Sequence, residues 1–390
     1  MLRIATIGTS MITDNLIEAL NQSDHAVFVG TLSRDAERAA SFTKEHGGSR
    51  PFTSLEELAA SDEVDAVYIG SPNALHAPQA LACIAQGKHV FVEKPFASNR
   101  AEAAKVFAAA ERAGVVALEA MRPVHDPAFA TVRELLSRLG QLRRASIRFG
   151  KYSSRYDNIL AGERTNIFDC AMASGSLMDI GVYPVEATVA LMGEPESICF
   201  APVLLDESTR DITNGAIDGA GTILARYPGR VVEIAFSKIT NDDLPVQFES
   251  ETATMTLDSI SVPSHASISY RGKVERGSAK VMRSQEGGRT EEFNLPTCPN
   301  TMTYELEDFI AAVEAVRSGC PAGDAPAGEY GTVGTFRGLT LATLSVMDEA
   351  RRQAGIVFPA DEPAAKQEAA HEEACAACQE SAGDGAGEGR

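Results

Sequence analysis

The segment HVFVEKPFASN (89–99) places a lysine directly after a short apolar strand. Open α/β folds bind their ligands at the carboxyl ends of parallel strands. Pro95 has a fixed φ angle and disfavours helical geometry at the residue before it, so Lys94 is expected to stay at the strand's end. Many strands end in a solvated charge, and the position alone is a weak signal. Three other segments strengthen the signal of Lys94. They are a glycine turn near the N-terminus, PNALH (72–76) and DIGVY (179–183).

The first apolar strand, LRIATIG, ends in a turn that could hold a dinucleotide. Dinucleotide-binding turns carry glycine at the first, third and sixth positions. Here Gly8 is kept, while Ser10 and Thr13 replace the other two glycines. Gly8 can still make the tight turn, and the start of the next helix still offers N–H groups to a pyrophosphate. An ordinary strand-to-helix turn is the alternative. The residues expected to contact a dinucleotide here are Gly8, Thr9, Ser10, Met11 and Ile12.

The second strand, HAVFVGTLS, indicates which dinucleotide the turn would take. A carboxylate at the end of this strand would bind the ribose 2′-hydroxyl of NAD, but the chain has none at that end. Ser33, Arg34 and Arg38 follow instead and could surround the 2′-phosphate of NADP. The alternative is a solvated helix start whose arginines pair with Asp35 or Glu37. The sequence favours NADP, with NAD as the alternative cofactor.

The first third of the chain alternates strand and helix patterns at short intervals, which is typical of a parallel sheet with crossover helices. We therefore predict an α/β fold with an N-terminal Rossmann domain, a doubly wound parallel sheet, over residues 1–121. Strands are expected over 2–8, 25–33, 50–52, 65–71, 88–93 and 115–120, and helices over 14–21, 36–46, 74–86 and 100–113.

After residue 121 the pattern changes to short segments rich in β-branched residues and broken by Gly, Pro and Asp. These segments predict a C-terminal α+β domain, residues 122–359, with a large and mostly antiparallel sheet. The segments are RRASIRFGKYS, ICFAPVL, AGTILARY, RVVEIAFSK, PVQFES and ATMTLDS. YPVEATVALMG predicts a helix between them. Amphipathic helices are expected over 304–317 and 337–353, and one of them should pack back on the first domain.

Charge and hydropathy limit the partners and the compartment. The chain has 35 basic and 54 acidic residues, a formal net charge of −19, which disfavours nucleic acids and anionic membranes. Its apolar runs are too short to span a membrane, and the N-terminus enters a strand pattern directly. We therefore expect a cytoplasmic protein that acts on a small-molecule substrate.

The last 31 residues differ from the rest in composition. Residues 360–390 are rich in acids, Ala and Gly and contain almost no large apolar side chain, which predicts a disordered tail. Cys375 and Cys378 lie there with His371 nearby, so a metal site is conceivable, but an unstructured tail is the preferred interpretation. The seven cysteines are odd in number and mostly scattered, which argues against a disulfide framework. No metal is expected.

Taken together, these segments resemble the glucose-fructose oxidoreductase, inositol dehydrogenase and MocA (Gfo/Idh/MocA) family of NAD(P)-dependent oxidoreductases. The resemblance covers nearly everything except the acidic tail. In many members the last position of DIGVY is histidine, and Tyr183 is similar to the dihydrodiol dehydrogenase and glucose-fructose oxidoreductase branches. The matching residues are Gly8, Ser33-Arg34, PNALH (72–76), Glu93-Lys94-Pro95, Glu119-Ala120 and DIGVY (179–183).

The resemblance implies hydride transfer between a nicotinamide and a secondary alcohol or carbonyl of a sugar, polyol or related diol. Because the cofactor carries the hydride, the protein must move a proton on the substrate oxygen. Tyr183 is the expected acid and base, and Lys94 would stabilise alkoxide character on that oxygen. Asp179 would orient the substrate hydroxyl or Lys94, since four residues separate it from Tyr183 on one helix face. A helix cap at Asp179 and core packing of Tyr183 are the alternatives.

Further binding residues are expected around these three. The cofactor would also contact Pro72, Asn73, His76, Glu93 and Lys94. Polar and aromatic residues at high density suit a hydroxylated substrate, although a solvated strand face and loop are the alternative. The expected substrate contacts are Lys94, Arg122, His125, Lys151, Tyr152, Arg155, Tyr156, Asp179 and Tyr183.

Two other functions stay open for this fold. One is a nucleotide-binding sensor without turnover, because a fold alone does not establish chemistry. The other is a glycoside hydrolase that uses NAD transiently, as some relatives do. The open-faced sheet of the second domain also suggests a homodimer or homotetramer, because such sheets often bury one face against a partner subunit.

Overall fold

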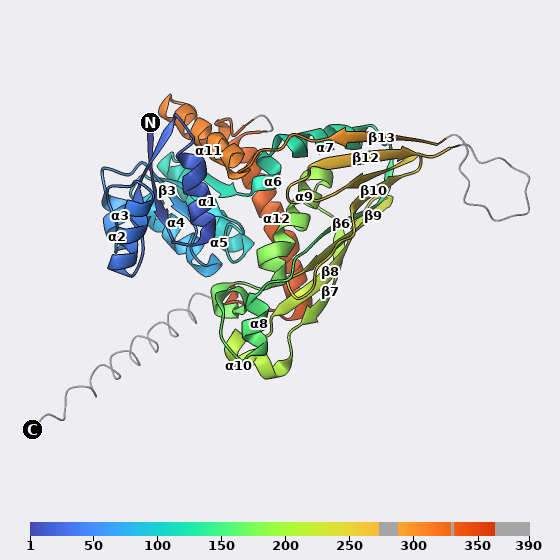
Figure 1. The fold of residues 1–390 in the computed structure, drawn as a ribbon, viewed down its shortest axis with the longest axis horizontal. Helices are drawn as coiled ribbons and strands as arrows, with labels where there is room; N and C mark the ends of the chain where they lie inside the picture. The colour runs from blue at the N-terminus through green and yellow to red at the C-terminus, as the bar shows by residue number, and fades with distance from the viewer. Residues whose placement is uncertain (273–287, 329–330, 363–390) are drawn as a thin grey trace, which may run out of the picture.

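The computed structural model describes residues 1–272, 288–328 and 331–362 of the chain. It places an N-terminal α/β part beside a large sheet seen nearly edge-on, and a long C-terminal helix lies between the two (Figure 1). Within the described residues, no helix is long and apolar enough to cross a membrane.

The buried apolar runs of the first third form a parallel sheet with strand order β2-β1-β3-β4-β5. Every residue of β3, β4 and β5 is buried, as parallel strands covered by helices on both faces require. The strands are β1 (Leu2–Ile7), β2 (Ala26–Leu32), β3 (Ala66–Ile69), β4 (His89–Glu93) and β5 (Ala117–Ala120). The helices are α1 (Met11–Leu20), α2 (Ala36–Glu45), α3 (Leu55–Ala60), α4 (His76–Ala85) and α5 (Arg100–Ala113).

The second sheet has the strand order β13-β12-β11-β10-β6-β9-β8-β7, and all its neighbours are antiparallel except β6 and β9. Its buried face packs on α9 (Val182–Met192). The strands are β6 (Leu142–Gly150), β7 (Ser197–Leu204), β8 (Asp218–Tyr227), β9 (Arg230–Ser237), β10 (Val246–Ser250), β11 (Ala253–Leu257), β12 (His265–Tyr270) and β13 (Arg289–Asn294). Short helices are α6 (Arg122–His125), α7 (Pro127–Ser137), α8 (Arg155–Leu160) and α10 (Arg210–Thr213).

The last two long helices bind the two sheets together. α11 (Met302–Arg317) packs on α1, and α12 (Val333–Ala354) packs on α9 and also on α5 and β5 (Figure 1). Thr340 of α12 donates a hydrogen bond to the buried Glu119 carboxylate over 2.6 Å. Asp348 of α12 accepts one from the backbone N–H of Arg100 over 2.9 Å. These two hydrogen bonds fasten α12 to the first domain.

The predicted fold class is confirmed, and the differences from the sequence reading are local. The strand expected over 50–52 is reduced to a single parallel bridge between Leu32 and Phe52. The helix expected from residue 74 begins at His76, after a 3₁₀ turn over Asn73–Leu75. Asp361 accepts hydrogen bonds from Asn99 and Arg351, so the chain stays attached to the first domain up to there. His371, Cys375 and Cys378 lie outside the described residues.

Candidate active site

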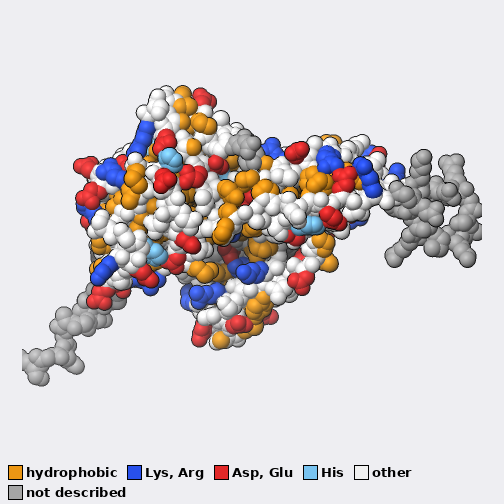
Figure 2. Space-filling view, turned by 45° about the horizontal axis from the view of Figure 1, so that its top comes forward, with side chains coloured by type: hydrophobic (Ala, Val, Ile, Leu, Met, Phe, Trp, Pro, Cys, Tyr) orange, Lys and Arg blue, Asp and Glu red, His pale blue; other side chains and the backbone are white. Residues whose placement is uncertain are grey.

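A cleft of about 960 Å³ opens at the carboxyl edge of the parallel sheet, between the two domains. The ends of β1 to β4 form one wall, and residues of the second domain form the other. Figure 2 shows the hollow, with Lys and Arg side chains at its edge. The residues that line it are Ile7, Gly8, Thr9, Ser10, Ile12, Leu32, Ser33, Arg34, Arg38, Gly70, Ser71, Pro72, Asn73, Leu75, His76, Gln79, Glu93, Lys94, Asn166, Ile167, Met172, Asp179 and Tyr183.

The turn after β1 has the geometry of a dinucleotide-binding turn in spite of its missing glycines. Gly8 has a φ of 110°, and a Cβ at this position would lie 2.7 Å from the carbonyl oxygen of Gly70. The absence of a side chain at Gly70 leaves room for the side chain of Thr13 on α1. A Cβ on Gly70 would lie 3.1 Å from Thr13 Oγ1. Thr13 can therefore replace the third glycine of the fingerprint, since Gly70 provides the space.

Helix α1 begins directly after this turn and directs its N-terminus at the cleft. Ser10 is the N-cap residue, and its hydroxyl makes no capping hydrogen bond within the described part of the chain. Ser10 and Ile12 line the cleft, whereas the side chain of Met11 is exposed and does not. The open N–H groups, the dipole of the helix and a free hydroxyl fit a pyrophosphate.

The two arginines after β2 differ in what they contact. Arg38 donates from Nε to Thr9 Oγ1 over 2.6 Å and from a terminal nitrogen to the Thr9 carbonyl over 2.8 Å. Arg38 therefore braces the Gly8 turn. Arg34 stands exposed at the cleft beside Ser33, where a 2′-phosphate on a bound ribose would be reached.

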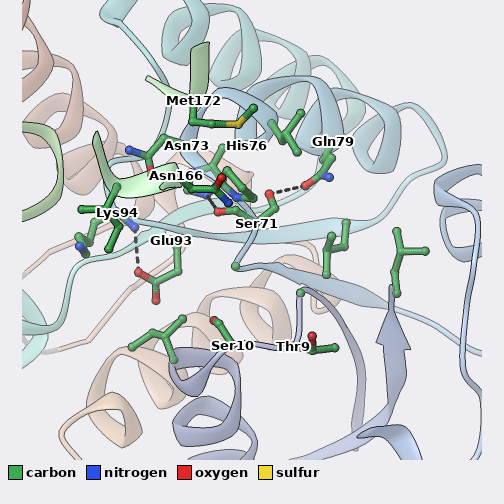
Figure 3. Close-up of a pocket in the computed structure, with 18 of the residues that line it drawn as sticks. Thr9, Ser10, Ser71, Asn73, His76, Gln79, Glu93, Lys94, Asn166 and Met172 are labelled. Carbon is green, nitrogen blue, oxygen red and sulfur yellow. Dashed lines mark hydrogen bonds between the residues drawn. The ribbon is translucent and has the colours of Figure 1, made fainter. Parts of the chain in front are cut away.

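Three residues from two segments of the chain meet at the other end of the cleft. Lys94 donates from Nζ to the carbonyl oxygen of Asp179 over 2.8 Å and to its Oδ1 over 3.1 Å. The same Nζ lies 5.0 Å from the centre of the Tyr183 ring. Arg122 donates to the Tyr183 hydroxyl over 3.5 Å. Figure 3 shows Lys94 and Glu93 together at the end of β4, apart from Thr9 and Ser10 on the turn before α1.

The charges of this group are fixed by one another. Burial opposes the charge of Lys94, but Asp179, Tyr183 and Glu93 outweigh it and raise the pKa of Lys94. Burial likewise disfavours ionised Asp179, but Lys94 and Lys238 hold the pKa of Asp179 well below its usual range. At neutral pH Lys94 is a cation and Asp179 an anion. The ring of Tyr183 lies beside this ion pair.

Glu93 lies buried behind Lys94. Tyr68 donates to its Oε1 over 2.6 Å, and the backbone N–H of Lys94 donates to its Oε2 over 3.2 Å. Burial raises the pKa of Glu93, and the ammonium of Lys94 opposes that rise. Glu93 therefore fixes the end of β4 and the backbone of the lysine.

His76 and Asn73 line the cleft, and their hydrogen bonds hold the loop after β3 in place. The two ring nitrogens of His76 lie 3.0 Å from the Pro95 carbonyl and 2.8 Å from the Ser71 carbonyl. Burial lowers the pKa of His76 to about 4, so the ring is neutral at pH 7. Asn73 donates across the cleft to the carbonyl of Ala173 over 2.8 Å.

Asp179 lies in a π-helical turn over Leu177–Gly181 that continues into α9. Such turns are frequent at functional sites. A Cβ on Gly181 would lie 3.0 Å from the ring of Phe236, so the missing side chain lets the turn pack directly on β9. The turn is also held by Asp218, which accepts from the N–H of Leu177 over 2.6 Å.

Asp218 makes the stability of this turn depend on pH. Burial raises the pKa of Asp218 to about 7, although the hydrogen bond from Leu177 opposes the rise. The folded chain then binds this proton more tightly than the unfolded chain, so the free energy of unfolding falls as pH rises between about 4 and 7, by up to about 1.4 kcal/mol per pH unit. Asp218→Asn should remove that loss, so its stability relative to wild type increases with pH. Urea unfolding at acidic and alkaline pH measures it, with exposed Asp24→Asn as the control; parallel curves for Asp218→Asn and wild type would contradict it.

Six predicted substrate residues do not line the cleft. His125 is buried, with Nδ1 2.7 Å from an Asp308 carboxylate oxygen and its ring stacked on Phe336. Tyr152 donates to Asp157 over 2.6 Å. The same holds for Lys151, Arg155 and Tyr156, which follow β6 outside the lining set. Arg122 is outside the lining set too, and it donates to the Tyr183 hydroxyl at the edge of the site.

Several lining residues carried no motif that sequence reasoning could use. Asn166, Ile167 and Met172 come from an irregular segment, and Ser71 and Gln79 hydrogen-bond to each other over 2.7 Å (Figure 3). Lys238 is not part of the lining set, but it contacts Asp179, and it follows the strand RVVEIAFS as Lys94 follows its own strand. The rule that singled out Lys94 does not find Lys238, because no proline follows it and its strand lies in a mostly antiparallel sheet.

Comparison with known proteins identifies the family. Residues 2–120 match the model of the "oxidoreductase family, NAD-binding Rossmann fold", and residues 129–254 match the "GFO/IDH/MocA C-terminal domain". The chain is 35% identical to scyllo-inositol 2-dehydrogenase (NADP(+)) of Bacillus subtilis, over 93% of this chain and 100% of the relative. It is 32% identical to an uncharacterized oxidoreductase of Escherichia coli, over 93% and 99%.

A solved structure agrees on the fold. A 3-ketoreductase from Actinomadura kijaniata superposes with a TM-score of 0.73 at 23% identity, over 90% of this chain and 97% of that chain. The resemblance in motifs, the two domains and the relatives of nearly full length agree. The chain belongs to the Gfo/Idh/MocA family of NAD(P)-binding oxidoreductases.

Proposed function

We propose that this chain is an NADP-dependent oxidoreductase that interconverts a secondary alcohol and a carbonyl on a small polyhydroxylated substrate. One observation carries the proposal: a lysine cation held by Asp179 against Tyr183, in the same cleft as a glycine turn at a helix N-terminus. The relative from Bacillus subtilis supports the choice of scyllo-inositol as the first substrate to test.

In this proposal the chain's residues manage the proton and the charge, and the nicotinamide supplies the hydride acceptor or donor. During oxidation the carbinol carbon loses a hydride and its hydroxyl loses a proton, which Tyr183 accepts. Lys94 stabilises the negative charge that develops on the substrate oxygen, and Asp179 keeps Lys94 in place. Reduction runs the same steps backwards, with Tyr183 donating the proton.

The cofactor preference rests on Arg34. Replacing Arg34 with alanine should weaken NADPH binding by about 10–100-fold, the worth of a charge-assisted hydrogen bond, and change NADH binding little. Titration of nicotinamide fluorescence measures both affinities. Arg112→Ala, which removes an exposed arginine at the end of α5, is the matched control. Equal affinities for NADPH and NADH in the wild type would contradict the preference for NADP.

The alternatives differ in what happens to the cofactor. The proposal expects nicotinamide absorbance to rise when the protein, NADP and scyllo-inositol are mixed. A sensor would bind NADP with no change in absorbance for any polyol, and a glycoside hydrolase would cleave a glycoside with no net change. The paired cation and anion beside Tyr183 favour turnover over sensing, because a sensor needs no such group.

The state of assembly and the compartment are part of the same proposal. We propose a cytoplasmic homodimer or homotetramer that associates through the second sheet. In support, β7, β8 and β9 expose Val203, Leu224 and Val231. Light scattering of the purified full chain measures the mass, and a monomer would contradict this part.

A further inference from the structure

Asp179 is bound by two lysines, one from each domain. Lys94, at the end of β4, occupies its Oδ1 and its backbone carbonyl. Lys238, which follows β9, makes a direct ion pair with Oδ2. The side chain of Lys238 is only 10% exposed. Both carboxylate oxygens are therefore engaged, and the carboxylate connects the second domain to the catalytic lysine of the first.

We propose that Lys238 is a positioning residue of the hydride-transfer site, which holds Asp179 so that Asp179 in turn holds Lys94 beside Tyr183. This inference rests on the roles of Lys94 and Tyr183 in the proposed function. Lys238 acts through Asp179 and is not assigned a contact with substrate.

The backbone of Lys238 gives its side chain a fixed origin. Its N–H donates to the Gly219 carbonyl and its carbonyl accepts from the N–H of Ser153, each over 2.9 Å. The lysine is thus held between the neighbouring strand β8 and the segment that follows β6. A group carried on a sheet positions its partner more accurately than one carried on a free loop. Asp179, by contrast, lies in a single π-helical turn.

The second lysine also sets the charge of the group. Lys94 from β4 and Lys238 after β9 face the Asp179 carboxylate, and Tyr183 of α9 lies beside Lys94. Two ammonium groups and one carboxylate carry a net charge of plus one. Glu93, behind Lys94, and Arg122, on Tyr183, are the next ionisable groups. Without Lys238, Asp179 would pair with Lys94 alone. Its Oδ2 would lose the ion pair that Lys238 makes, and the carboxylate group could rotate.

The test is Lys238→Met, which keeps most of the length of the side chain and removes its charged end. Its crystal structure should show Lys94 Nζ displaced by about 1 Å or more from its place over Tyr183, a shift that can cost about 100-fold in rate. With NADP and scyllo-inositol we expect kcat to fall about 100-fold, with NADPH affinity and melting temperature near wild type. Loss of one cation lets Asp179 protonate at a higher pH, so the acid limb of the kcat profile should also move upward.

Two further variants separate positioning from a structural role. Lys238→Arg keeps the charge and should retain a larger share of kcat than Lys238→Met. Lys105→Met removes an exposed lysine of α5 and should leave kcat unchanged. Three results for Lys238→Met would each overturn the inference. Lys94 could keep its wild-type position, kcat could stay within threefold of wild type, or the fall in kcat could equal the fraction of protein that is unfolded. If the wild type turns over no polyol, the proposed function fails, and the structure of Lys238→Met still decides whether Lys238 positions Lys94.

Discussion

Lys94→Met and Tyr183→Phe are each expected to lower kcat by about 100-fold or more while NADPH still binds. In the proposed mechanism Lys94 supplies the positive charge that stabilises the alkoxide, and loss of one such donor costs about 10²–10³-fold. In the same mechanism Tyr183 transfers the proton, a step that contributes about 10²–10⁴-fold. Lys94 contacts Asp179 at the far end of the cleft from the Gly8 turn, so NADPH affinity should change little (Figure 3).

The measurement is steady-state turnover with scyllo-inositol, beside fluorescence titration with NADPH. Tyr270→Phe is the control for the lost hydroxyl, because Tyr270 lies in β12 of the second sheet, away from the lining set. Lys105→Met is the control for the lost ammonium. Wild-type turnover in either Lys94→Met or Tyr183→Phe would remove that residue from the catalytic group.

Gly8→Ala is expected to abolish measurable NADPH binding and to destabilise the first domain. A Cβ at Gly8 would lie 2.7 Å from the Gly70 carbonyl, and neither backbone can move without disturbing β1 or β3. The φ of 110° adds backbone strain of about 1–3 kcal/mol for a residue with a side chain. The turn and the first N–H groups of α1 should therefore lose the geometry that a pyrophosphate needs.

Gly47→Ala separates the effect of backbone strain from the effect of the steric clash with Gly70. Gly47 also has a positive φ, 77°, but a Cβ there would meet no described atom within 4 Å. It should lose stability from backbone strain alone and bind NADPH as the wild type does. Thermal unfolding and nicotinamide fluorescence of both variants give the comparison. Gly8→Ala that binds NADPH within threefold of wild type would show that this turn is not the dinucleotide site.

The fold could be predicted from the sequence because its elements follow local rules. Buried parallel strands read as continuous apolar runs, and both domains were assigned from such runs and from alternating β-branched segments. The prediction of a strand over 50–52 was wrong. Phe52 makes an isolated bridge to Leu32, and tertiary contacts decide such a pairing. Lys94 was placed correctly at the end of β4 because Pro95 marks that end.

Site residues could be predicted where a motif fixes both the residue type and its place at the end of a strand or helix. Residues whose partners depend on tertiary structure could not be predicted. Lys94, Asp179 and Tyr183 come together as the resemblance implied. Arg38 was expected around a phosphate; it lines the cleft, and its contacts with Thr9 could not be predicted because the partner of a long side chain depends on tertiary structure. His125 was expected in the pocket for its chemistry, but it is buried against Asp308.

Side chains that meet only through the fold escaped sequence reasoning. Nothing near Thr13 in the sequence indicates that Gly70, which follows β3, provides the space for it. Lys238 reaches Asp179 from the end of β9, across a sheet whose register the sequence does not state. Such pairings join residues dozens of positions apart, and they require the structure.

The most direct test of the account is the transfer of deuterium from substrate to cofactor. The full chain is incubated with NADP and scyllo-inositol deuterated at its carbinol carbons, and the recovered cofactor is examined by mass spectrometry and NMR. The account predicts NADPH that carries one deuterium on the nicotinamide ring and a substrate oxidised to a ketone. Oxidised polyol with NADPH that carries no deuterium, or NADP recovered unchanged with every polyol tried, would contradict it.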